Sequence, residues 1–130
     1  MTKELTFRNA ILCEYVAPGA HNKHTLVNVY SGNIIVQKFP AALRFGLYVE
    51  LSRKSDDIKV LELTIKLANK SVVKGQIAID PKKDTKDANV VLQSFPLDVK
   101  EATTLSVLIG AQGSRKSRVL YKTITQGQIN

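Results

Sequence analysis

A group of basic residues near the end of the chain has the composition of an anion-binding loop. Four basic residues follow the last acidic residue, Glu101, and these are Arg115, Lys116, Arg118 and Lys122. Side chains at a hairpin tip can reach phosphate oxygens, and phosphate contacts require no base-reading residues. The four residues can therefore bind nucleic acid or another polyanion non-specifically, although a solvated basic surface that aids solubility is the simpler interpretation. Further lysines cluster in the middle of the chain: Lys66, Lys70, Lys74, Lys82, Lys83 and Lys86.

The histidines and the single cysteine suggest a metal site or a nucleophile pair, and the sequence favours neither. His21 and His24 are three residues apart and can share an ion, but a metal site needs more ligands at workable spacing. Two solvated loop histidines are the simpler interpretation. Cys13 and His24 can be drawn as a nucleophile and its base. Cys13, however, lies on an apolar stripe, which predicts a buried and unreactive thiol.

Two loops contain aspartates of the kind that bind calcium in some β-sandwiches. Lysines lie among the aspartates of the longer loop and would repel a divalent cation. The sequence also lacks a phosphate-binding glycine loop of the G-x-x-x-x-G-K-[ST] type, a G-x-G-x-x-G motif and a G-x-S-x-G motif. We therefore expect no metal, no cofactor and no catalytic residue. The aspartates are Asp56, Asp57, Asp80, Asp84 and Asp87.

The elements that position these residues are β-strands, because apolar and polar residues alternate along most of the chain. The clearest strand is 43–51, and turn-forming residues recur about every 8 to 12 residues, a spacing typical of antiparallel sandwiches. Residues 1–130 are therefore predicted to form one all-β domain, a single antiparallel β-sandwich of about eight strands with an immunoglobulin-like or related topology. The extended segments are 7–15, 24–30, 34–37, 43–51, 60–67, 72–79, 90–95, 104–109 and 118–125.

The alternation also predicts which side chains form the core. Two packed sheets would share an interior of apolar residues from the central strands. Strict alternation in the first strand places Phe7, Ile11, Cys13 and Tyr15 on one face, and Arg8, Ala10, Leu12 and Glu14 on the other. Pro96 is expected to end the strand before it. The predicted core residues are Phe45, Leu47, Val49, Leu61, Leu63, Ile65, Val107 and Ile109.

The first part of the chain resembles a known family. The segments 10–16 (AILCEYV), 23–30 (KHTLVNVY), Phe39–Pro40 and the alternating strand 43–51 occur in this order. They are similar to those of a family of small bacterial β-sandwich proteins of unknown function. The resemblance implies the architecture already read from the alternation, and it implies no activity, ligand or site residue.

Composition narrows the classes of function. The chain has 130 residues with 19 Lys+Arg against 11 Asp+Glu, giving a formal charge of +8. Its longest runs without a formal charge, 24–37 and 102–114, are shorter than the roughly 20 apolar residues that cross a bilayer. No apolar signal core follows the N-terminus, and one cysteine allows no disulfide within the chain, so we expect a cytoplasmic location and no membrane contact.

The expected function is that of a non-enzymatic protein-binding or assembly module. Sandwiches that are not closed into barrels have edge strands, and an edge strand can pair with a second chain. The expected partner is therefore a protein, and one form of such pairing is a homo-oligomer through a sheet edge. The alternative is non-specific binding of nucleic acid or another polyanion through the basic hairpin loop.

Overall fold

The computed structural model describes residues 5–54, 57–79 and 87–127. These residues form nine strands and one short 3-10 turn. None of the helices found in this part of the chain is long and apolar enough to span a membrane. The elements are β1 (Leu5–Pro18), η1 (Ala20–Asn22), β2 (His24–Val29), β3 (Ile34–Val36), β4 (Ala41–Arg53), β5 (Val60–Leu67), β6 (Lys70–Ala78), β7 (Asp87–Val99), β8 (Thr103–Ala111) and β9 (Ser117–Gln126).

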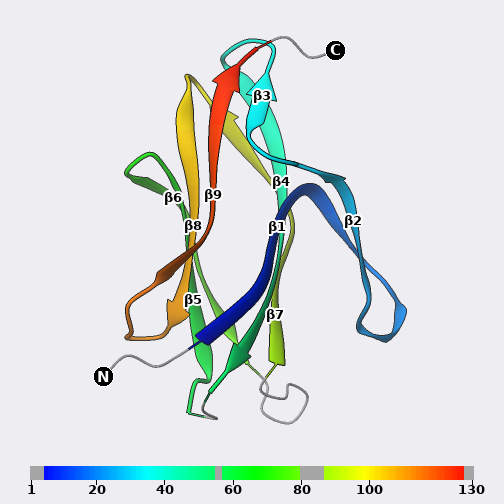
Figure 1. The fold of residues 1–130 in the computed structure, drawn as a ribbon, viewed down its shortest axis with the longest axis vertical. Helices are drawn as coiled ribbons and strands as arrows, with labels where there is room; N and C mark the ends of the chain where they lie inside the picture. Colours follow the sequence, from blue (N-terminus) through cyan, green and yellow to red (C-terminus); the bar gives the residue numbers. More distant parts are fainter. Residues whose placement is uncertain (1–4, 55–56, 80–86, 128–130) are drawn as a thin grey trace.

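The strands form two packed sheets, which confirms the predicted β-sandwich (Figure 1). Sheet A has the strand order β2-β1-β4-β7, and sheet B has the order β3-β9-β8-β5-β6. All pairs but one are antiparallel. The exception corrects the purely antiparallel prediction, because the short strand β3 pairs in parallel with β9. Figure 1 shows the β1–β2 hairpin extending away from the rest of the sandwich.

The core lies between the sheets and includes the side chains that alternation in the central strands assigns to it. All eight predicted core residues are buried, and Leu61, Leu63 and Ile65 point to the same interior. The largest of the fully buried side chains is Phe45 of β4. Its ring lies 5.3 Å from that of Tyr30 and 5.9 Å from that of Phe95, measured between centroids. Burial of this apolar surface is the main force that holds the sheets together.

The first strand departs from strict alternation. The pairing of β1 with β4 shifts register between Phe7 and Asn9, which indicates a β-bulge. An extra residue in one strand moves the following side chains to the opposite face. Leu12 is consequently buried in the core, although alternation counted from Phe7 placed it on the other face.

Strand β7 also differs from the prediction, because it continues through Pro96 to Val99. Pro96 pairs with Arg44 of β4. Proline has no N–H to donate to a neighbouring strand, and it is tolerated where no second neighbour needs that hydrogen bond. β7 is the last strand in the order of sheet A, so the strand need not end at its proline.

Candidate functional site

The outer face of sheet B gathers several of the basic side chains. In β5, Leu63 and Ile65 are buried in the core. Because side chains alternate along a strand, Thr64 and Lys66 lie on the outer face. Lys74 of β6 pairs with Thr64 and shares that face. The central lysines at 66 and 74 are therefore brought together by the β5–β6 hairpin.

A hollow of about 440 Å³ lies on this face, beneath the β8–β9 loop. An adjoining hollow of about 380 Å³ shares Thr64, Lys74 and Lys116 with it. Thr64 is only 7% exposed although it lies on the outside of the sheet, because neighbouring side chains cover it. We call the first hollow the basic groove. Its lining consists of Thr64, Lys66, Ser71, Lys74, Leu108, Ser114, Arg115 and Lys116.

Main-chain hydrogen bonds hold the β8–β9 loop beside the groove. The N–H of Gln112 donates to the carbonyl oxygen of Val60 at 2.9 Å. The N–H of Gly113 donates to a carboxylate oxygen of Glu62 at 3.3 Å. Gly113 has a φ of +79°, a conformation that glycine adopts without steric cost. These contacts anchor the loop on β5, the strand that supplies Lys66.

Gly110 allows the loop to fold back over the sheet. A Cβ atom at Gly110 would lie 2.9 Å from the carbonyl oxygen of Arg115 and 2.9 Å from the Cα of Lys116. Any larger residue would therefore push the two basic residues away from the sheet. The missing side chain at this position brings the loop cations close to those of β5 and β6.

The groove has an excess of positive charge. Four cations line it, namely Lys66, Lys74, Arg115 and Lys116. Among the described residues that line either hollow, Glu62 is the sole carboxylate, and it already accepts the Gly113 N–H. Like charges held close together repel one another and raise the local positive potential. An anion placed among them would relieve this repulsion, while the hydroxyls of Thr64 and Ser71 can donate hydrogen bonds to it.

Arg118 and Tyr121 continue the same outer face on β9. Arg118 pairs with Leu108, which lines the groove, and Tyr121 pairs with Ser106 of β8. The guanidinium carbon of Arg118 lies 4.5 Å from the centroid of the Tyr121 ring, a cation–π contact. Tyr121 as a residue remains 49% exposed. An aromatic surface thus lies beside the basic groove.

Lys122 lies apart from the other predicted site residues. Its ammonium donates hydrogen bonds to the carbonyl oxygens of Tyr30 at 2.8 Å and Gly32 at 2.6 Å. The structure therefore places Arg115 and Lys116 in the groove, Arg118 beside it and Lys122 elsewhere. Lys66 and Lys74 complete the groove. The sequence shows that these lysines alternate with apolar, inward-facing residues and so lie on the outer face. That they lie close to the β8–β9 loop depends on the pairing of distant strands.

The histidines and the cysteine do not form a reactive cluster. Cys13 pairs with Val29 and His24 with Pro18, so the two lie at opposite ends of the β1–β2 hairpin. Cys13 is fully buried, as predicted, and burial raises the pKa of its thiol. Within the described ranges, no three His, Cys, Asp or Glu residues gather as a metal site would require.

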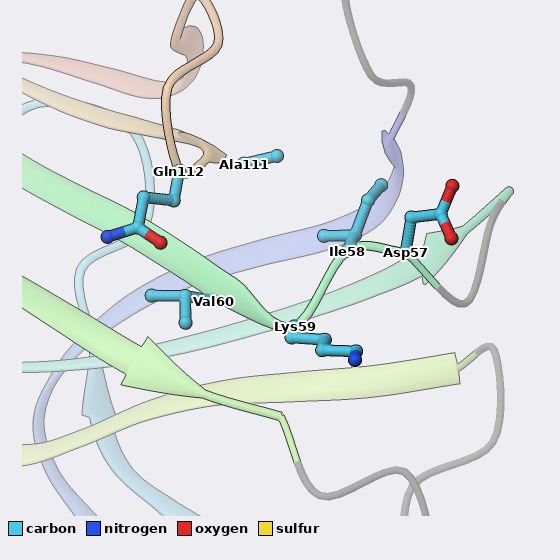
Figure 2. A pocket seen from close by; sticks show the side chains of 6 residues that line it. All are labelled: Asp57, Ile58, Lys59, Val60, Ala111 and Gln112. Atoms are coloured by element: carbon cyan, nitrogen blue, oxygen red, sulfur yellow. The ribbon is translucent and has the colours of Figure 1, made fainter.

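The aspartates do not assemble a site either, as far as the structure describes them. Asp87 accepts hydrogen bonds from Arg8 and Ser52 on the outside of sheet A. Asp57 lines a hollow of about 220 Å³ at the end of β5. Figure 2 shows its carboxylate pointing away from Val60 and Gln112 on the other side of that hollow. The remaining candidates, Asp56, Asp80 and Asp84, lie outside the described residues, as do Lys82, Lys83 and Lys86.

A scan against protein-family models gives no match, and a search of curated proteins gives none either.

Proposed function

We propose that the protein is a non-enzymatic binding module that holds a polyanion in the basic groove. The observation that supports this proposal is the convergence of Lys66 and Lys74 from one hairpin with Arg115 and Lys116 from another. The groove offers cations and hydroxyls from β5, β6 and the anchored β8–β9 loop, and these groups suit phosphate or sulfate oxygens.

The binding of inorganic polyphosphate at several salt concentrations tests the proposal. Each phosphate that a lysine or arginine neutralises releases counterions, so affinity should fall steeply between about 50 and 200 mM salt. We expect Arg115→Ala with Lys116→Ala to weaken binding. We expect Lys66→Ala with Lys74→Ala to weaken it by a similar factor, because both pairs line one groove.

A matched control removes the same charge elsewhere. Lys23 and Lys38 are exposed and absent from the lining of the basic groove. Lys23→Ala with Lys38→Ala should leave the affinity close to that of the unaltered protein. If all three double variants lose affinity equally, net charge rather than the groove attracts the anion, and the proposal is wrong.

A second candidate function is pairing with a protein strand, and the β1–β2 hairpin favours it. β2 is an edge strand of sheet A. Of the five large apolar residues that are exposed in the described part of the chain, three lie on this hairpin: Tyr15, Val27 and Val29. Tyr15 and Val27 face each other across the two strands. An exposed edge with apolar side chains can add a strand from a second copy or another protein.

The oligomeric state of the purified protein tests this second function. Val27→Lys places a charge on the apolar surface and should shift any dimer towards monomer in analytical ultracentrifugation. Ile35→Lys adds the same charge at another exposed apolar position and should have no effect. A monomer at all concentrations would rule out self-pairing.

We also propose a cytoplasmic location in a bacterial cell. The resemblance of the first strands to a bacterial family supports a bacterial origin. The buried lone thiol of Cys13 fits a compartment that keeps cysteines reduced.

A further inference from the structure

We propose that the polyanion is single-stranded nucleic acid, and that Tyr121 stacks on one of its bases. This inference rests on the proposed function of the basic groove and names its ligand. The four groove cations supply contacts for a phosphate chain. The added observation is the exposed aromatic residue Tyr121 on the same outer face of sheet B. It lies on β9, which pairs with β8 beside the groove.

The strand register places the ring and the cations in neighbouring rows across the sheet. One row runs from Lys74 through Thr64 and Leu108 to Arg118. The next row runs from Ser71 through Lys66 and Ser106 to Tyr121. Strands in a sheet are about 4.8 Å apart, so each row spans roughly 15 Å. A short stretch of nucleotides can therefore contact lysines at one side and the ring at the other.

The Arg118–Tyr121 pair suits a nucleobase better than a plain polyanion. The guanidinium carbon lies 4.5 Å from the ring centroid, while Tyr121 as a residue stays about half exposed. Both a tyrosine ring and a guanidinium plane are surfaces on which bases stack. Polyphosphate and sulfated sugars have no flat aromatic group that could use this surface.

The same surface favours single strands over a duplex. In a duplex the bases stack on one another, and their flat faces are hidden from a protein ring. In a single strand the bases can swing out, and stacking is tolerant of base identity because every base has an aromatic face. The ligand is thus a flexible strand whose phosphates lie over the groove while one base lies on Tyr121.

Fluorescence anisotropy with a labelled oligothymidylate of about 12 nucleotides tests the inference, since single-strand sites on β folds span about 4–16 nucleotides. We expect Tyr121→Ala to weaken binding by about tenfold, the loss of one stacked base. Tyr121→Phe keeps the ring and should retain most of the affinity. Tyr15→Ala removes an aromatic ring of similar exposure from sheet A and should have no effect.

Parallel measurements separate this inference from the proposed function. Polyphosphate should bind Tyr121→Ala and the unaltered protein equally, and a duplex of the same length should bind more weakly than the single strand. If Tyr121→Ala leaves oligonucleotide binding unchanged, or the duplex binds as tightly, the inference is wrong while polyanion binding stands. If neither polyphosphate nor oligonucleotide binds, the proposed function fails as well.

Discussion

The ammonium of Lys122 donates a hydrogen bond to the main-chain carbonyl oxygen of Tyr30 at 2.8 Å. This bond joins β9 of sheet B to the residue that follows β2 of sheet A. The same ammonium bonds the carbonyl oxygen of Gly32 at 2.6 Å, so one side chain fixes the crossing between the sheets. Lys122 is therefore a structural residue.

Replacement of Lys122 by methionine should lower stability and leave ligand binding unchanged. Hydrogen bonds from a charged donor contribute about 1.5–3 kcal/mol, and the variant leaves two carbonyl oxygens without this donor. We expect the free energy of unfolding in urea to fall by about 2 kcal/mol. Lys116→Met is the matched variant and should show the reverse pattern, weaker polyphosphate binding at nearly unchanged stability. A Lys122→Met protein that is stable but binds poorly would contradict this assignment.

A Gly110→Ala variant should displace the basic loop. The added Cβ would meet main-chain atoms of Arg115 and Lys116 at 2.9 Å, and main chain cannot rotate away as a flexible side chain can. Such overpacking costs about 1–3 kcal/mol. We expect a lower unfolding midpoint together with weaker polyphosphate binding. Gly75→Ala in β6 is the control for stability, since nothing lies within 4 Å of its added Cβ, and it should not lower the unfolding midpoint.

The sandwich could be predicted from the sequence because its central strands alternate without interruption. In β5, Leu61, Leu63 and Ile65 form a single stripe, and each is buried. The prediction failed where one extra residue interrupts the alternation. The bulge after Phe7 shifts the register of β1 against β4 and brings Leu12 into the core opposite Leu47. Sequence alone gave no signal for that bulge, because it depends on how β1 pairs with β4.

The candidate site, too, could be predicted from the sequence only in part. A glycine-containing loop between strands predicts exposed cations, and Arg115 and Lys116 are found there. Strict alternation places Arg118 and Lys122 on one face, but a register shift leaves Val119 as an extra residue between them. The two side chains therefore lie on opposite faces of β9. Lys74 joins the site through strand pairing over a long sequence distance, which no local pattern reveals.

Lowering the pH should reduce the free energy of unfolding through protonation of Asp87, on the outside of sheet A. The Ser52 hydroxyl, at 2.7 Å, and the Arg8 guanidinium, at 2.9 Å, hold the pKa of Asp87 below its usual value. A lowered folded-state pKa means that the stabilisation is present above about pH 4 and is lost as the pH falls through the folded-state pKa. Asp87→Asn should therefore flatten the acid limb of a plot of unfolding free energy against pH. Ser52→Ala removes the largest cause of the shift and should move the limb to higher pH; unchanged limbs in both variants would contradict this account.

Alkali should destabilise the protein through Tyr30. Burial raises the pKa of Tyr30 to about 12, and nearby Glu14 adds to the effect, while the hydroxyl donates to the carbonyl oxygen of Arg44 at 3.0 Å. Because the folded state holds this proton more tightly than the unfolded chain, the stabilisation is full below about pH 10 and is lost as the pH rises towards about 12.

Tyr30→Phe removes both the hydrogen bond and the titration. We expect it to be less stable than the unaltered protein by about 1 kcal/mol near neutrality, and the difference should shrink as the pH rises above about 10. Urea unfolding of both proteins across this range measures the difference, with tyrosinate absorbance as the independent readout. A difference that stays constant with pH would show that Tyr30 does not titrate in the folded state as its burial requires.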